Sequence, residues 1–200
     1  MALDTYANIK VALQTWLSRA DLASDVDDMI DMFEAWCNRR LRVPQMEQEA
    51  TAPASEYLPL PDDFLELRDI QWQGVPRYEL EYMSPSMADI YDTTGEAAPS
   101  RFYSLVGDQL RLIPAPDSAT SIRIAYWKRL PPLSDAIPSN WLLDLYPDAY
   151  LYGPMVHGNL RIKDMDMAQQ VQQGWTNIAA DIQRAGKNSN VGSLLRVRVA

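Results

Sequence analysis

The sequence predicts an α+β protein in which helices from both ends of the chain form an antiparallel bundle, and a small antiparallel β-module, inserted between them in the sequence, projects from it. Apolar residues recur at helical spacing in the first fifty residues and again after residue 139. Residues 49–138 instead show strand alternation broken by frequent prolines and turn signals. We therefore expect a helical bundle from residues 1–48 and 139–186, a β-rich insertion over 49–138, and an extended C-terminal arm over 187–200.

The first fifty residues predict a pair of amphipathic helices. The first begins after a cap at Asp4 or Thr5 and carries Tyr6, Ile9, Leu13, Trp16 and Leu17. The second begins after Ser24, with Asp27 as a capping-box-like partner, and ends before Pro44. Its apolar stripe consists of Val26, Met29, Ile30, Phe33, Cys37 and Leu41.

The inserted segment is predicted to hold five or six strands. Residues 77–82 and 122–126 alternate in the manner of strands, and residues 65–72 form a further strand before Gln73-Gly74. Gly107-Asp108 predicts a two-residue hairpin between strands over 102–106 and 109–113. Ser84-Pro85 predicts the start of a short helix.

The C-terminal third returns to helical patterns. Ser139 is expected to cap a short helix, and the next one opens at Pro147 and is interrupted, with a kink, at Pro154. Asp164 is expected to cap a last helix, which ends at Gly186. Its apolar face comprises Met167, Val171, Trp175, Ile178 and Ile182. The residues from Asn188 to Gly192 have a hinge composition, and an apolar–basic segment follows.

The net charge of −9 is unevenly distributed. An acidic run without Lys or Arg covers Asp21, Asp25, Asp27, Asp28, Asp31 and Glu34, whereas the stretch from Arg184 onward is basic and holds no acid. An acidic body repels phosphates and should not grip nucleic acid over its whole surface. No apolar run is long enough to cross a membrane, and no signal peptide is recognisable at the N-terminus.

The sequence offers little for catalysis. It has a single cysteine, Cys37, and a single histidine, His157, and it lacks the glycine-rich phosphate loops and the GxSxG and HExxH motifs. Cys37 lies on an apolar stripe and is expected to be a core residue. The Asp27–Asp31 pair offers oxygen ligands one helical turn apart that could hold a metal, but acids near a helix N-terminus more simply stabilise the helix dipole. We expect neither a metal nor a cofactor.

Several strings resemble those of tailed-bacteriophage head-to-tail adaptor proteins. They occur in order over nearly the whole chain and include FEAWCNRRLR at 33–42, YLPLPDDFLELR at 57–68, LEYMSP at 80–85, PSRFY at 99–103 and LRLIPAP at 110–116. The resemblance implies a neck protein of the virion, made in the host cytoplasm. Copies would form a ring, commonly a dodecamer, beneath the portal protein, and would extend the DNA channel toward a downstream tail or neck protein.

This resemblance suggests roles for particular residues. The portal-binding arm would comprise Val191, Leu194, Leu195, Arg196, Val197, Arg198 and Val199. The channel, through which DNA passes without specific binding, could be lined by Asp25, Asp27, Asp28 and Asp31. Contacts to the next ring or a neighbouring subunit are expected from Tyr78, Tyr82, Tyr91, Phe102 and Tyr103.

Alternative functions remain open on sequence alone. The chain could be another tail-junction protein, such as a tail-tube terminator, or a cytosolic binding module. A different class is a small carboxylate-dependent hydrolase using Asp62 or the Asp27–Asp31 pair. The absence of recognisable catalytic motifs favours a structural protein over an enzyme.

Overall fold

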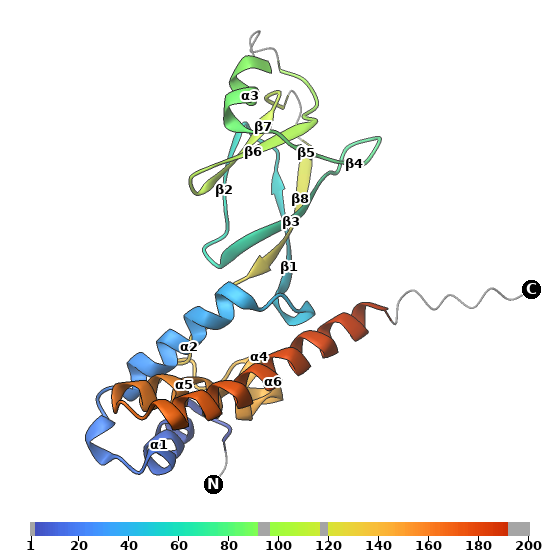
Figure 1. Cartoon of the computed structure of the whole chain (residues 1–200). Coiled ribbons are helices and arrows are strands. Elements are labelled where there is room, and N and C mark those ends of the chain that lie inside the picture. Colours follow the sequence, from blue (N-terminus) through green and yellow to red (C-terminus); the bar gives the residue numbers. More distant parts are fainter. Residues whose placement is uncertain (1–2, 92–96, 117–119, 192–200) are drawn as a thin grey trace, which may run out of the picture. The chain divides into compact units, whose positions relative to one another are not determined.

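The structure is a computed structural model, and it describes residues 3–91, 97–116 and 120–191, without the side chains of residue 20 and residues 188–191. The chain divides into a helical unit, built from Met1–Met46 and Leu130–Ala200, and a β unit, Glu47–Arg129 (Figure 1). The predicted α+β class is confirmed: the N- and C-terminal helices pack together, and the β-rich segment is inserted between them in the sequence. That insertion contains two sheets, where a single small module was expected.

The helical unit is organised around α5 (Pro147–Arg161), which packs against all the other long helices of the unit. These are α1 (Tyr6–Leu17), α2 (Val26–Arg40) and α6 (Met165–Val191), and the short α4 (Trp141–Leu145) precedes α5. Phe33 lies at the centre, with its ring centroid 5.1 Å from Tyr150 and 4.9 Å from Trp175, both edge-on. A Cβ atom on Gly153 would lie 2.1 Å from the Phe33 ring, so glycine is what lets α5 approach α2 here.

The predicted interruption at Pro154 is wrong, because α5 runs through this residue as one helix. A proline inside a helix lacks the N–H that would bond to the carbonyl four residues earlier, which ordinarily breaks or bends the helix. In α5 almost every residue from Ala149 to Asn159 is buried or half-buried against neighbouring helices. Tertiary packing on several sides therefore offsets the lost hydrogen bond.

The helix starts agree only in part with the predicted caps. Thr5 accepts a hydrogen bond from the Asn8 amide, 3.3 Å, and Asp164 accepts from the Met167 amide, 3.0 Å, as expected. The capping box at Ser24 is wrong: the N-cap of α2 is Asp25, and the Ser24 hydroxyl donates to its carboxylate. Asn140, not Ser139, caps α4, because its side-chain oxygen accepts the amides of the first helical turn.

The last helix also continues further than the sequence indicated. It passes Gly186 and ends at Val191, so part of the expected hinge is helical. A Cβ atom on Gly186 would lie 3.0 Å from Pro44 Cδ and 3.2 Å from Val43 Cγ1. The glycine thus allows α6 to lie close to the segment after α2, and it does not end the helix. The remainder of the predicted arm, residues 192–200, lies outside the described residues.

The β unit contains two four-stranded sheets, ordered β1-β8-β3-β4 and β2-β7-β6-β5. The strands are β1 (Glu47–Pro53), β2 (Tyr57–Pro59), β3 (Phe64–Trp72), β4 (Tyr78–Glu79), β5 (Glu81–Tyr82), β6 (Phe102–Val106), β7 (Gln109–Ile113) and β8 (Ser121–Lys128). The predicted hairpin is confirmed as β6 and β7, with Val106 opposite Gln109 and Gly107 at φ +64°. The predicted helix after Ser84 is confirmed as α3 (Pro85–Tyr91).

Two features of the β unit differ from the expected antiparallel module. The strand predicted over 77–82 is divided at Leu80, so that β4 joins one sheet and β5 the other. Leu80 is buried, and its amide donates to the Ile70 carbonyl, 2.9 Å, which turns the chain between the sheets. In addition, β5 pairs with β6 in parallel. The core between the strands is made of Leu58, Ile70, Trp72, Leu80, Leu110, Leu112, Ile122, Ile124 and Tyr126.

The chain returns to the helical unit through residues 130–138, a segment that the sequence analysis assigned to the insertion. The Leu130 amide donates to Asn38 Oδ1, 2.8 Å, and the Leu133 amide donates to Glu34 Oε1, 2.9 Å. Both acceptors lie on α2, which explains why the unit boundary falls at residue 130 rather than 139.

Candidate functional site

The acidic run does not form one site, because its members face different partners. Asp25 pairs with Arg161 Nε, 3.1 Å. Asp27 pairs with Lys10 Nζ, 2.7 Å, and accepts from the Tyr6 hydroxyl, 2.8 Å; the Lys10 hydrogen bond lowers the Asp27 pKa. Asp28 and Asp31 are exposed. Within the described part of the chain, no three His, Cys, Asp or Glu side chains gather in a way that could hold a metal ion.

Glu34 belongs to the same run but lies inside the helical unit, only 4% exposed. Its Oε1 accepts from the Leu133 amide, 2.9 Å, and from the Tyr150 hydroxyl, 2.8 Å. Burial raises the Glu34 pKa to about 7, despite these two hydrogen bonds, which act in the opposite direction. Glu34 is thus separated from the exposed members of the acidic run. Helical periodicity could have predicted the burial of Glu34, since position 34 falls between Phe33 and Cys37 on the apolar stripe.

Cys37 and His157 lie in separate environments. Cys37 is fully buried on α2, and burial raises the pKa of its thiol, the opposite of what an activated thiolate needs. His157 is half-buried on α5, and burial together with the nearby Arg39 charge lowers its pKa. It lines a groove of about 540 Å³ between α2 and α5, with Asp25, Asp28, Met29, Met32, Leu160 and Arg161.

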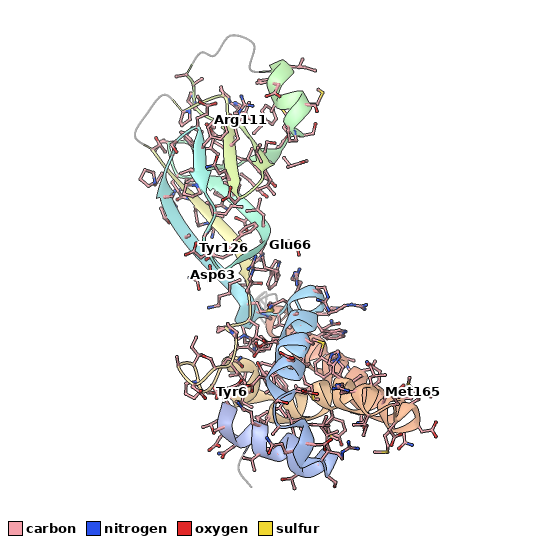
Figure 2. The ribbon with its side chains drawn as sticks, turned by 90° about the vertical axis from the view of Figure 1, so that its left-hand side faces the viewer. Tyr6, Asp63, Glu66, Arg111, Tyr126 and Met165 are labelled. Carbon is pink, nitrogen blue, oxygen red and sulfur yellow. The ribbon has the colours of Figure 1, made fainter. Side chains whose placement is uncertain are left out.

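The Asp62-Asp63 pair forms a turn at the start of β3, where the Phe64 amide donates to the Pro61 carbonyl, 2.9 Å. Asp63 accepts from the Tyr126 hydroxyl, 2.9 Å, and Figure 2 shows the two side chains next to each other on the β unit. Burial raises the Tyr126 pKa to about 12, and the hydrogen bond to Asp63 adds to the rise. Asp63 therefore anchors a core tyrosine, and Asp62 is exposed.

The aromatic residues predicted to make contacts divide into exposed and supporting ones. Tyr82 and Tyr91 are 59% and 55% exposed. Each rests edge-on against a half-buried ring of β6: Tyr82 on Tyr103, 5.7 Å between centroids, and Tyr91 on Phe102, 5.3 Å. Tyr78 instead stacks on buried Trp72, and its hydroxyl donates to the Ser100 carbonyl.

Tyr91 stands on α3 beside two further exposed apolar residues of that helix. The α3 patch is defined here as Met87, Ile90 and Tyr91, and Ile90 is 67% exposed. Tyr82 lies apart from it, because Tyr103 and Phe102, on which Tyr82 and Tyr91 rest, are consecutive on β6 and point to opposite faces of the sheet. Ala88 of α3 is fully buried and packs the helix onto the β unit. Met87 and Ile90 are not among the contact residues predicted from the sequence, because a helix of this length gives too few turns to show which face is inward.

The helical unit also displays large apolar side chains. Trp16 is 58% exposed near the end of α1, contrary to its predicted place on the buried face. Met165 and Met167 are exposed at the start of α6, so the predicted apolar face of that helix begins only with Ala168 and Val171. Leu145 and Leu160 are further exposed apolar residues.

Apolar side chains displayed on both units are typical of proteins that contact other proteins. No helix in the described ranges combines the length and apolar character needed to cross a membrane.

The chain matches the SU10 adaptor protein family over residues 4–198 and belongs to that family, which makes it a bacteriophage adaptor protein. The resemblance recognised in the sequence is thus confirmed. No curated protein matches the chain.

Proposed function

We propose that this protein is a head-to-tail adaptor, copies of which form a ring beneath the portal and extend the DNA channel toward the tail. The observation that carries the proposal is the family match, which covers nearly the whole chain. The apolar surfaces on both units support it, because a ring subunit must contact its neighbours as well as the proteins above and below. The ring is expected to hold twelve copies, as the family resemblance implies.

The portal contact is assigned to the end of the chain, Val191 and residues 194–199. Leu194, Leu195, Val197 and Val199 are apolar, and Arg196 and Arg198 alternate with the valines. In an extended conformation such a segment offers apolar groups on one side and guanidinium groups on the other. A segment of this kind is suited to pair with a strand of the partner, and its arginines can form bidentate ion pairs with the partner's carboxylates.

The α3 patch and Tyr82 are assigned to the next ring or a neighbouring subunit, with Phe102 supporting Tyr91 and Tyr103 supporting Tyr82. Aromatic and apolar residues are enriched at the centres of protein interfaces. For the channel, Asp28 and Asp31 are the better candidates, because Asp25 and Asp27 already pair with cations. Carboxylates facing DNA would repel its phosphates and leave it free to slide.

Deletion of residues 192–200 tests the portal contact. The shortened protein should keep its melting temperature and lose sedimentation with purified portal, because the described helical core is complete without these residues. A matched pair separates the two components: Leu194→Ser with Leu195→Ser removes apolar contact, and Arg196→Gln with Arg198→Gln removes charge. A lower melting temperature with unchanged portal binding would mean that the segment packs on its own bundle.

Electron microscopy of assembled particles tests the position of the ring. We expect the copies directly beneath the portal. Location at the tail-tube end would instead support a tail-tube terminator and contradict the adaptor position. A stable small oligomer that does not respond to portal would contradict both the ring and its docking.

A further inference from the structure

A buried carboxyl joins three segments of the helical unit. Glu34 Oε1 on α2 accepts from the Tyr150 hydroxyl of α5, 2.8 Å, and from the Leu133 amide, 2.9 Å. No basic side chain forms an ion pair with Glu34 among the residues that the structure describes. A carboxyl in this setting is costly to ionise, because its charge has neither water nor a cation nearby.

Leu133 belongs to residues 130–140, a segment without regular secondary structure. Hydrogen bonds to side chains hold this segment in place. Asn38 Oδ1 accepts the Leu130 amide, 2.8 Å, one turn along α2 from Glu34. At the other end, the Asn140 amide group donates to the Pro131 carbonyl and to the Tyr150 hydroxyl, both 2.7 Å. The Glu34 carboxyl is the carboxylic acceptor in this network, and the segment is the first part of the chain to re-enter the helical unit.

The charges around Glu34 do not favour its ionised form. Asp31 and Cys37 lie on the same helix, and Tyr150 faces it from α5. Burial raises the Glu34 pKa most, and the negative charge of Asp31 raises it further, whereas the hydrogen bonds from Leu133 and Tyr150 lower it by less. Opening of the segment would bring the carboxyl into water, where its ordinary pKa returns.

We propose that Glu34 is a proton-controlled latch on residues 130–140: the protonated carboxyl holds the segment on α2, and ionisation favours its release. The ionised carboxylate would accept the same two hydrogen bonds more strongly, but the cost of keeping the charge away from water is larger. Release therefore increases as the pH rises. The latch goes beyond the adaptor role and does not depend on it.

Amide hydrogen exchange of the full-length protein tests the latch. With the carboxyl titrating near 7 when closed and 4.5 when open, the open fraction should rise roughly tenfold between about pH 6 and about pH 8.5. After correction for intrinsic exchange, Leu130 and Leu133 should lose that much protection. Leu80, whose amide bonds to Ile70 in the β unit, is the reference and should not change.

Glu34→Gln is the control variant, because its amide oxygen can accept the same bonds but cannot ionise. Its Leu130 and Leu133 amides should keep the same protection at both pH values. A carbon NMR titration of the wild-type Glu34 carboxyl adds a readout that needs no variant, and its midpoint should lie well above 4.5.

Several results would overturn the proposal. Loss of protection at Leu133 alone would restrict the effect to one hydrogen bond, since Leu130 is held by the uncharged Asn38. Constant protection in the wild type, or an ordinary titration midpoint for Glu34, would show that the carboxyl controls nothing. The same pH dependence in Glu34→Gln would assign it to another group.

Discussion

The helical unit and the β unit place their charged groups differently. The helical unit holds a carboxyl, Glu34, within its core, and interlocks Phe33 with the Gly153 face of α5. The β unit keeps its charges on the sheet surface, where Arg123 pairs with Asp69 at 2.9 Å and with Glu49 on a neighbouring strand. Its core consists of aliphatic and aromatic side chains from both sheets.

This difference indicates which changes each unit tolerates. Close helix approach leaves no space for an added methyl group, whereas a core of branched aliphatic side chains is most sensitive to lost volume. Exposed ion pairs contribute little, so the charges of the β unit should matter less for stability than the single buried carboxyl of the helical unit.

Gly153→Ala should have the largest effect on stability. The added Cβ would lie 2.1 Å from the Phe33 ring, which cannot move freely because Tyr150 and Trp175 pack against it. We expect a loss of about 3 kcal/mol or more in the free energy of unfolding, measured by denaturant titration. Gly174→Ala is the control, since its Cβ would lie 2.9 Å from the half-buried Tyr152 ring, which can rotate away. Equal losses in both variants would contradict the interlocking of α5 with α2.

Leu110→Ala tests how much core packing contributes to the free energy of unfolding of the β unit. Leu110 is fully buried, and its truncation should cost about 3 kcal/mol through lost transfer energy and a cavity. Amide hydrogen exchange, measured separately for peptides of each unit, should show a loss of protection in the β unit. Val106→Ala, at an exposed site on the neighbouring strand, should change little. A similar loss of protection throughout the helical unit would mean that the units unfold together, and the comparison between them would fail.

The buried carboxyl should make stability depend on pH. Glu34 has a raised pKa when folded, so its contribution is fully present below about pH 4.5 and is lost as the pH rises through about 7. Between about pH 5 and about pH 8 this amounts to roughly 2.5 kcal/mol of unfolding free energy. Glu34→Gln should flatten this part of the pH profile measured by thermal or chemical unfolding. A wild-type profile that rises over this range would contradict the prediction.

Local patterns allowed much of the fold to be predicted. The apolar stripe of α2 and the hairpin around Gly107 depend on residues close in sequence, and both are confirmed. In contrast, β1 was not predicted, because Glu47–Pro53 has no large apolar residues and ends in proline. It becomes a strand by pairing with β8, in which Trp127 stands opposite Glu47.

The candidate sites were harder to predict, because exposure depends on tertiary packing. Tyr78 and Tyr82 belong to one alternating stretch, yet the turn at Leu80 leaves Tyr78 stacked on Trp72 and Tyr82 exposed. Likewise, helical periodicity could have located Glu34 on the buried stripe, but only the structure shows that the Leu133 amide, distant in sequence, meets it there. Long-range contacts of this kind have no local signature.

Ile90→Ser should have the smallest effect on stability and a large effect on assembly. Ile90 is 67% exposed, so its replacement should change the free energy of unfolding by no more than about 0.5 kcal/mol. If the α3 patch lies at the centre of an interface, losing this side chain should weaken association of the adaptor copies or of the next ring by tenfold or more. Sedimentation of the assembled necks measures this. Val106→Ser, another exposed apolar residue of the β unit, is the matched control and should assemble normally. Normal assembly of Ile90→Ser would remove the α3 patch from the interface, and equal defects in both variants would indicate a general dependence on surface hydrophobicity.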